Sequence, residues 1–477
     1  MLITLECILL ALQAVAAVQL ALESPIGITS QSNNRLSKRS PVELSGDIKT
    51  CYTMKFNIDG VDLDLYVDSA ISDMMVPLSS PTKNVGPALQ HTPSEKPVSI
   101  NYKGNDCKGV SSEAAVTIPD TRITGVNLPV IAVEKQSADL IGINERFNGI
   151  FGFGHSLLSN HHTSTTAIDV LYSKNVIPNN EVGLQLCPYE MSQESFINIG
   201  NTDITPKCGT DGRSVAWVES PSDDHFAINI KDILVNDKPV NLPAEFQKTI
   251  MENGHTLYSV VETCSAYMQF PKVVVAALVS AILDSGAITA KNTMFRSKLD
   301  KDEIQGIFWG NYLMPELNFN INWDMMPTIS VAMFAENPVT VDNRNSIVMI
   351  ELGPKDYMQI VDSKYVVFAI KVGSNDNANL GIPFMTRLVL TFDRKHKRIG
   401  LGPGCGCETI TDGYPIISTH YQVLWPSSQL PKQPSTSGSD GTFIRRRKPS
   451  TTTDQVAVSE KTHQTVKSHK QTLNKLD

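Results

Sequence analysis

After its first 22 residues the chain has no apolar run long enough to span a bilayer, and few segments show helical periodicity. Charged residues make up only 19% of the 477 residues, and the formal net charge is −8. A mildly acidic chain of this kind does not favour a nucleic-acid-binding protein. The cysteines are scattered and no paired histidine motif accompanies them, so no metal site is expected. The segment GFGHS (152–156) lacks the third glycine of a dinucleotide loop, so no cofactor is expected either.

Hydrophobic residues make up 41% of the chain, which is enough for a large folded core. Between Cys51 and Pro403 the sequence consists mostly of short β-type runs separated by turn residues, such as TMKFNI, VDLDLYV and RLVLTF. The clearest helical pattern is PKVVVAALVSAIL (271–283), with proline at its first position and Asp-Ser-Gly after its end. These patterns predict a mostly β protein with few helices, and the length of 477 residues allows two or three ordinary domains or one large β-rich body of two lobes.

The N-terminal segment MLITLECILLALQAVAAVQLA has the length and the small terminal residues of a signal peptide. A polar segment with the dibasic pair Lys38–Arg39 follows it. We therefore predict a signal peptide at 1–22, a propeptide at 23–47, and a protein that is secreted or resides in the lumen of the secretory pathway. The alternative for the dibasic pair is an exposed linker.

The C-terminal region differs from the rest of the chain in composition. From about residue 409 it is rich in Ser, Thr, Pro, Gln and Lys and has little apolar patterning. Such a composition cannot bury enough apolar surface to offset the entropy of ordering the chain. We predict that 409–477 is a C-terminal extension, disordered from about residue 430.

One acidic residue stands out in the segment LYVDSAISDMMVP (65–77). A β-type run leads to Asp68, small residues follow it, and a second β-type run begins at once. In isolation, Asp68 would be interpreted as a turn-initiating aspartate. The functional interpretation is a carboxylate held at the base of a cleft.

Further segments, in a fixed order along the chain, favour the functional interpretation. They are VSINYKGNDCKG (98–109), NGIFGFG (148–154), VGLQLC (182–187), SFINIGNTD (195–203) and TFDRKHKRIGLGP (391–403). Together with the Asp68 segment, this set resembles the pepsin-type (A1) aspartic proteases, and in particular their β-secretase (memapsin) branch. The resemblance extends from Cys51 to Pro403, about 350 residues, and its last motif is the most specific.

The resemblance implies a bilobal pepsin-like fold of two β-barrel-like lobes, an N-terminal lobe at 48–205 and a C-terminal lobe at 206–408. It implies that Asp68 is one of two catalytic carboxylates, with Ser69 in the hydrogen-bond network beneath them and Tyr102 on the flap hairpin. In this family one carboxylate from each lobe shares a proton with the other, and the pair activates a water molecule that attacks the peptide bond.

Two residues compete for the second carboxylate. Glu252 lies in TIMENGHT (249–256), between a strand-rich segment and the helical segment that starts at Pro271. Asp284 belongs to the tripeptide Asp-Ser-Gly, which spells the family motif but also serves as a helix stop. The interval from Asp68 is 252 − 68 = 184 for the first and 284 − 68 = 216 for the second. The first interval is about the usual one in the family that the chain resembles, and the second is longer. The interval and the sequence context therefore favour Glu252, with Asn253 as its polar neighbour, and leave Asp284 as the alternative.

Both catalytic motifs are altered in this interpretation. Ala70 replaces the first glycine and Glu252 replaces the second aspartate. An extra methylene moves a carboxylate by more than ~1 Å, a misplacement that can cost about a hundredfold in rate. Two functions therefore remain open: a weakly active aspartic endopeptidase acting on proteins or peptides, and an inactive protein of the same fold that binds them in its cleft. We expect a monomer without a membrane span.

Seven cysteines remain after the signal segment, so one thiol is free or pairs between chains. The resemblance implies that Cys187 forms a disulfide with Cys405 or Cys407. These two cysteines lie on either side of the position at which the family carries the partner cysteine. The remaining pairings cannot be assigned from spacing.

Overall fold

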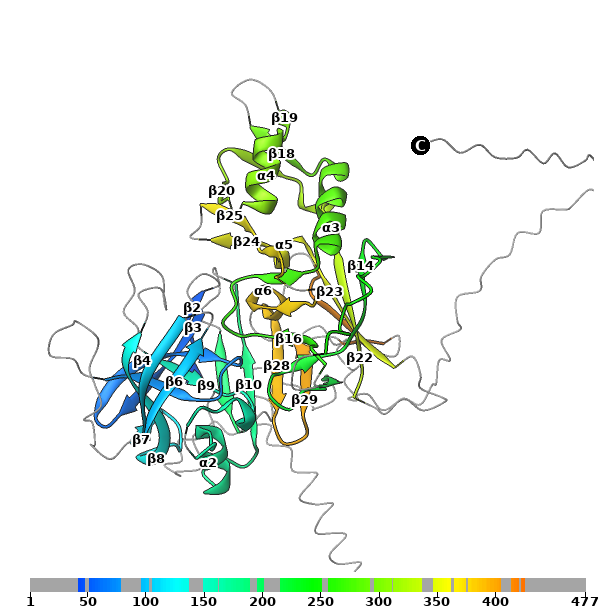
Figure 1. Cartoon of the computed structure of the whole chain (residues 1–477). Helices are drawn as coiled ribbons and strands as arrows, with labels where there is room; N and C mark the ends of the chain where they lie inside the picture. Colours follow the sequence, from blue (N-terminus) through cyan, green and yellow to red (C-terminus); the bar gives the residue numbers. More distant parts are fainter. Residues whose placement is uncertain are drawn as a thin grey trace, which may run out of the picture. The chain divides into compact units, whose positions relative to one another are not determined.

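The computed structural model of the chain (Figure 1) describes residues 42–47, 51–78, 96–102, 105–136, 149–161, 163–188, 195–200, 215–250, 256–291, 296–310, 312–336, 346–361, 364–374, 376–404, 413–419 and 422–424. All statements below concern these residues. The predicted signal peptide and most of the predicted propeptide lie outside them, as does the predicted disordered tail.

The first half of the chain forms an eight-stranded sheet, here called the first-lobe sheet, whose strands are blue and cyan in Figure 1. Its strand order is β2-β3-β4-β9-β5-β8-β7-β6. The strands are β2 (Ser45–Asp47), β3 (Cys51–Ile58), β4 (Val61–Asp68), β5 (Met74–Pro77), β6 (Pro97–Tyr102), β7 (Asn105–Thr117), β8 (Val126–Gln136) and β9 (Ile150–Gly152). Along β4 the side chains at 63, 65 and 67 are buried and those at 62 and 64 are exposed, as the alternating pattern predicts.

The second half contains a five-stranded sheet, the second-lobe sheet, in the order β13-β16-β27-β17-β26. Its strands are β13 (Ala227–Ile228), β16 (Ser259–Val261), β17 (Met268–Phe270), β26 (Ile370–Val372) and β27 (Asn379–Leu380). This sheet repeats part of the first. In each, a strand pairs in parallel with a short inserted strand, β4 with β9 and β16 with β27. The inserted strand also pairs antiparallel with another strand of the same sheet, β9 with β5 and β27 with β17.

A third sheet, the joining sheet, contains strands from both halves of the chain in the order β1-β11-β10-β28-β29-β12. Its strands are β1 (Val42–Glu43), β10 (Glu181–Gln185), β11 (Phe196–Ile199), β12 (Ala216–Glu219), β28 (Leu388–Asp393) and β29 (Arg398–Pro403). The pairing of β10 with β28 joins the two halves (Figure 1). Residues 42–47, at the end of the predicted propeptide, form β1 and β2 and pair with β11 and β3.

Three further sheets, one of six strands and two of three strands, complete the second half, in the orders β15-β14-β22-β23-β30-β31, β19-β18-β21 and β20-β25-β24. Their strands are β14 (Ile230–Val235), β15 (Lys238–Pro239), β18 (Ile288–Lys291), β19 (Arg296–Lys298), β20 (Met314–Pro315), β21 (Phe319–Ile321), β22 (Ile329–Phe334), β23 (Ile347–Leu352), β24 (Met358–Val361), β25 (Tyr365–Phe368), β30 (Ile416–Thr419) and β31 (Gln422–Leu424).

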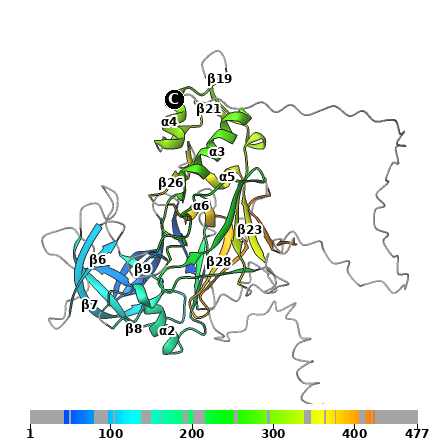
Figure 2. The same ribbon diagram turned by 45° about the vertical axis from the view of Figure 1, so that its right-hand side comes forward.

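The α-helices of the described part are short: α2 (Ala167–Ser173), α3 (Lys272–Ser285), α4 (Lys301–Trp309), α5 (Pro354–Tyr357) and α6 (Ile382–Met385). Helix α3 packs against β14 and β26 (Figure 2). It begins after Pro271 and ends at Gly286, whose φ of 65° lies in the left-handed region that favours glycine. The helix predicted at 271–283 is therefore confirmed, and it includes two residues more at its C-terminal end.

The aromatic core joins the two halves. Phe153, which follows β9, packs edge-on against Phe392 of β28 with ring centroids 5.3 Å apart, and Phe226 contacts both rings. All three side chains are at most 1% exposed. The all-β, two-lobed architecture with few short helices is confirmed. In the described ranges no helix is long and apolar enough to cross a membrane.

Candidate active site

Asp68 is the last residue of β4, and its side chain is fully buried. The backbone N–H of Ala70 donates to its Oδ1 at 2.8 Å. The hydroxyl of Tyr102, at the end of β6, donates to its Oδ2. The strand thus delivers a carboxylate into a tight turn, where backbone and side-chain donors hold it.

The residue after Asp68 is bonded to a distant segment of the second half of the chain. The N–H of Ser69 donates to Oγ1 of Thr263 at 2.9 Å, and the N–H of Thr263 donates to Oγ of Ser69 at 3.1 Å. Each hydroxyl in turn donates to the backbone across the site, Ser69 Oγ to Val261 O and Thr263 Oγ1 to Val67 O, both at 2.9 Å. Because each residue makes the same two hydrogen bonds to the other segment, Val67 is structurally equivalent to Val261, and Ser69 to Thr263.

The residue between Val261 and Thr263 is Glu262, which therefore occupies the position equivalent to Asp68. The strand registers give the same correspondence, because Tyr66 pairs with Ile150 of the inserted strand as Val260 pairs with Asn379. The sequence spacing agrees as well. Pro77 follows Asp68 by 77 − 68 = 9 residues, and Pro271 follows Glu262 by 271 − 262 = 9 residues.

Glu262 is partly buried at the end of β16. Its backbone N–H donates to the carbonyl oxygen of Leu380 at 3.1 Å. Its Oε2 accepts a hydrogen bond from Nδ2 of Asn379 at 2.6 Å. The carboxyl group is thus held by a side chain of the inserted strand β27.

Tyr102 is electrostatically coupled to both acidic residues. Burial raises the pKa of Tyr102 well above its ordinary value, and the charge of Asp68, the hydrogen bond to Asp68 and the charge of Glu262 raise it further. The hydroxyl therefore stays protonated and acts as a donor over the whole range in which carboxylates titrate. Asp68 and Glu262 thus both act on one phenol.

A disulfide crosses between the two lobe sheets beside these acids. Cys51, the first residue of β3, is bonded to Cys264, and their Cα atoms are 5.0 Å apart. Cys264 follows Thr263 and is therefore equivalent to Ala70 of the first motif. The site is thus cross-linked by a covalent bond and by the Ser69–Thr263 hydrogen bonds.

The other cysteines match the expectations in part. Among the described residues Cys107 is a free thiol, and burial, followed by the charge of Asp106, raises its pKa to about 11. Cys187 is disulfide-bonded. Cys405 and Cys407, the partners predicted for it, lie outside the described residues, so its pairing stays a prediction.

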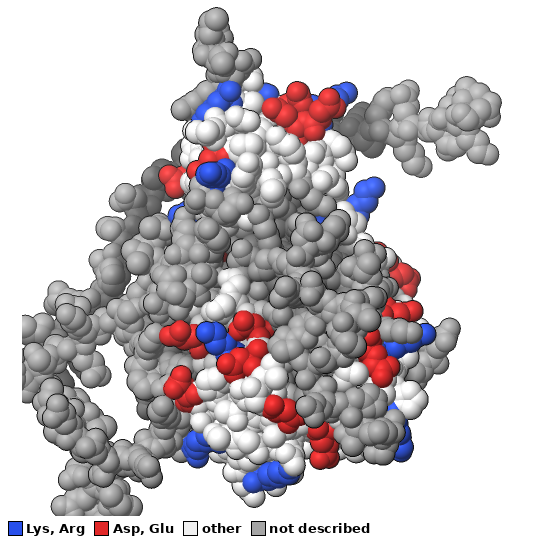
Figure 3. Space-filling view, turned by 90° about the vertical axis from the view of Figure 1, so that its left-hand side faces the viewer, with Lys and Arg blue, Asp and Glu red and all other residues white. Residues whose placement is uncertain are grey.

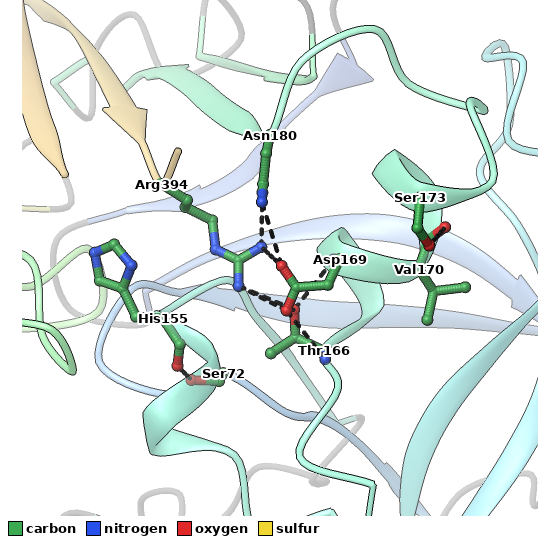
Figure 4. Close-up of polar contacts among 8 residues, drawn as sticks. All are labelled: Ser72, His155, Thr166, Asp169, Val170, Ser173, Asn180 and Arg394. Atoms are coloured by element: carbon green, nitrogen blue, oxygen red, sulfur yellow. Dashed lines mark hydrogen bonds and ion pairs between the residues drawn. The ribbon is translucent and has the colours of Figure 1, made fainter. Parts of the chain in front are cut away.

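An ion-pair network joins the β28–β29 turn to helix α2 (Figure 4). Arg394, between β28 and β29, donates from Nη1 to Oδ1 of Asp169 at 2.9 Å and to Oδ1 of Asn180 at 2.8 Å. Its Nη2 donates to Oγ1 of Thr166 at 3.0 Å, and Thr166 caps the first turn of α2 together with Asp169. Although burial opposes it, the charge of Arg394 and these hydrogen bonds hold the pKa of Asp169 below its ordinary value.

His155 contacts the turn after Asp68 and the ring of Phe226. Its carbonyl oxygen accepts a hydrogen bond from the hydroxyl of Ser72, in the turn after Asp68 (Figure 4). Its ring is tilted against the ring of Phe226, with ring centroids 4.6 Å apart, and the carbonyl oxygen of Phe226 accepts a hydrogen bond from the N–H of Val261, beside Glu262. Within the described part of the chain its Nε2 is buried without a hydrogen-bond partner. Burial, and then the charge of Arg394, lowers its pKa to about 4, so the ring is neutral at neutral pH.

The structure brings Asp68, Ser69 and Tyr102 together but does not describe the favoured second acid. Glu252 and Asn253 lie in 251–255, outside the described residues. Asp284 is exposed on the last turn of α3, where Ser280 Oγ lies 3.4 Å from its Oδ2. Glu262 was missed by sequence reasoning. The available signal was the repeated spacing Val-acid-hydroxyl, then methionine and proline, in 67–77 and 261–271.

The charge distribution gives no further site. On the face shown in Figure 3, Lys and Arg side chains are scattered among Asp and Glu side chains, without a continuous basic surface among the coloured residues. Within the described ranges no group of three or more His, Cys, Asp or Glu side chains is arranged to hold a metal ion. The chemistry available at the site is therefore that of two carboxyl groups, a phenol and an amide.

Comparison with protein families gives one match. A family model described as eukaryotic aspartyl protease matches residues 88–404, which is more than half of the chain. No curated protein matches the chain.

Proposed function

The chain belongs to the eukaryotic aspartyl protease family, and from that premise we propose that it is an aspartic endopeptidase whose catalytic carboxyl groups are Asp68 and Glu262. The observation that carries the proposal is the reciprocal hydrogen bonding of Ser69 and Thr263, since it sets the two acidic residues at equivalent positions. The substrate class is an unstructured peptide or protein segment.

The proposed mechanism is general acid–base catalysis by the pair. Asp68, whose two oxygens accept hydrogen bonds from the Ala70 N–H and the Tyr102 hydroxyl, acts as the base that removes a proton from the attacking water. Glu262 acts as the acid partner that polarises the peptide carbonyl. Since two nearby carboxylates do not ionise together readily, the pair holds one proton.

Substrate binding must displace Tyr102 in this mechanism. Its hydroxyl bonds Oδ2 of Asp68, an oxygen that the attacking water needs. Tyr102 lies on the β6–β7 hairpin, at the edge of the first-lobe sheet. The hairpin therefore has to shift when a peptide enters, and the tyrosine hydroxyl is then free to bond the peptide.

A second candidate function is peptide binding without cleavage. It is favoured by the donors that already satisfy the two carboxyl groups, Tyr102 on Asp68 and Asn379 on Glu262. It is also favoured by the two substituted glycine positions, Ala70 and Cys264, which constrain both turns. The two functions use the same site and differ only in whether the carboxyl pair activates water.

Cleavage of an unstructured protein at acidic pH distinguishes the two. The endopeptidase proposal predicts fragments with the wild-type chain and none with Asp68→Asn. A peptide that binds the wild-type chain and is recovered intact after long incubation would support the second function instead.

Further features of the sequence belong to the same proposal. We propose passage through the secretory pathway, a signal peptide at 1–22, processing near Lys38–Arg39, lobes at 48–205 and 206–408, and a monomer. Membership of the β-secretase branch rests on the motifs quoted above. Expression of the full chain, with N-terminal sequencing of the mature product, tests the processing.

A further inference from the structure

Asn379 occupies a position that an apolar residue fills in the first lobe. In the second-lobe sheet it pairs with Val260 and Gln269. In the first-lobe sheet the residue with the equivalent two partners, Tyr66 and Met75, is Ile150, which is 1% exposed. An amide in the middle of a sheet must find hydrogen-bond partners to offset the loss of water.

The two polar atoms of the amide differ in what they contact. Nδ2 donates to Oε2 of Glu262 at 2.6 Å. Within the described part of the chain, Oδ1 is buried and has no hydrogen-bond partner. Such a buried acceptor needs an explanation, because leaving one unsatisfied costs about 1–3 kcal/mol.

We propose that Asn379 is a positioning residue for Glu262 and serves both protonation states of that carboxyl group. Nδ2 donates to the ionised carboxylate, as observed. A 180° rotation of the amide exchanges Nδ2 for Oδ1, which then accepts a hydrogen bond from the O–H of the neutral carboxylic acid. The otherwise unpaired Oδ1 thereby gains a partner when Glu262 holds the proton of the pair and no peptide carbonyl accepts its hydrogen bond.

The length of the glutamate side chain explains why such a partner is needed here. Glutamate has one more rotatable bond than aspartate, so its carboxyl group is less well fixed by the turn alone. A hydrogen bond from a side chain on the rigid inserted strand removes that freedom. This inference rests on the proposed role of Glu262 as the acid partner.

The inference is tested with Asn379→Ile, which installs the residue found at the equivalent position of the first lobe. The matched control is Asn377→Leu, two residues away, whose amide bonds backbone groups of Leu257 and Gln247 instead. Three quantities are measured for both variants: kcat, KM and the pH dependence of kcat/KM. A fourth is the titration of the Glu262 carboxyl carbon by NMR, assigned with Glu262→Gln.

A charge-assisted hydrogen bond to the carboxylate is stronger than the neutral one to the acid, so the net effect of Asn379 favours ionisation. Asn379→Ile should therefore raise the pKa of Glu262 measured by NMR by about one pH unit. The midpoint of the basic limb of the kcat/KM profile should rise by the same amount. The substitution should lower kcat about tenfold and leave KM within about twofold, because the substrate site is unchanged. Asn377→Leu should shift neither the titration nor the limb.

Unchanged Glu262 titration and an unchanged basic limb in Asn379→Ile would overturn the inference even if the wild-type chain cleaves peptides. A shifted titration in a wild-type chain that cleaves nothing would retain Asn379 as the partner of Glu262 and remove the proposed function. The two failures are thus distinguished.

Discussion

Ser69 and Thr263 lie 194 residues apart in the sequence, and each hydroxyl oxygen accepts the backbone N–H of the other residue. Both side chains are nearly inaccessible to solvent, at 1% and 2% exposure. The two hydroxyls also satisfy the carbonyl oxygens of Val261 and Val67. Because these bonds fix the turns that carry Asp68 and Glu262, they tie the stability of the protein to the geometry of the site.

Replacement of the Thr263 hydroxyl by a methyl group tests this coupling. Thr263→Val leaves the N–H of Ser69 and the carbonyl of Val67 buried without their partner, which should cost about 2–5 kcal/mol of the free energy of unfolding. The control is Thr289→Val, because the hydroxyl of Thr289 is buried without a partner in the described part of the chain and its loss should cost little. Urea unfolding measures both, and equal effects of the two substitutions would contradict the coupling.

The disulfide between Cys51 and Cys264 should stabilise the folded chain by restricting the unfolded one. The two cysteines are separated by 213 residues, and a bridge that closes a long loop contributes about 2–5 kcal/mol. Cys51→Ala combined with Cys264→Ala should lower the free energy of unfolding by that amount. Cys107→Ala, which removes a buried free thiol, should cost about 1 kcal/mol. A double variant as stable as the wild type would show that the bridge is dispensable.

His155 should make the protein less stable as the pH falls. Its pKa is about 4 in the folded chain and 6.5 in the unfolded chain, so between these values the unfolded state binds the proton more readily. The contribution of the neutral ring is fully present above pH 6.5 and is lost as the pH falls to about 4. Burial is the main cause of the low pKa of His155; of the charged groups, Arg394 and Lys397 lower the pKa further and Asp223 and Asp169 raise it.

His155→Phe keeps the contact with Phe226 and removes the proton site. The free energy of unfolding of the wild-type chain should fall by up to about 3 kcal/mol between pH 6.5 and pH 4 more than that of the variant. Urea unfolding at a series of pH values measures this difference. Parallel pH dependence in the two chains would show that His155 does not titrate in this window.

Much of the fold could be predicted from the sequence, because strand periodicity and turn residues are local signals. The helix after Pro271 and the strand before Asp68 are examples. Strand periodicity and turn residues do not identify Glu262, since its equivalence to Asp68 is established by the Ser69–Thr263 hydrogen bonds, between residues 194 apart, and its only signal in the sequence is the repeated spacing in 67–77 and 261–271. The tripeptide Asp-Ser-Gly at Asp284 and the interval from Asp68 to Glu252 are weaker evidence for the second catalytic acid than the strand registers. The pairing of Cys51 with Cys264 is likewise a property of the folded chain, because spacing alone does not assign disulfides.

The most direct test of the central claim is the rate of peptide cleavage by Glu262→Gln, compared with Glu252→Gln and Asp284→Asn, at acidic pH. Glu262→Gln should lower kcat at least about a hundredfold, as loss of a catalytic acid does, with little change in KM. The other two substitutions should leave kcat within about twofold of the wild type. Full activity in Glu262→Gln, with activity lost in Glu252→Gln or Asp284→Asn, would contradict the pairing of Asp68 with Glu262.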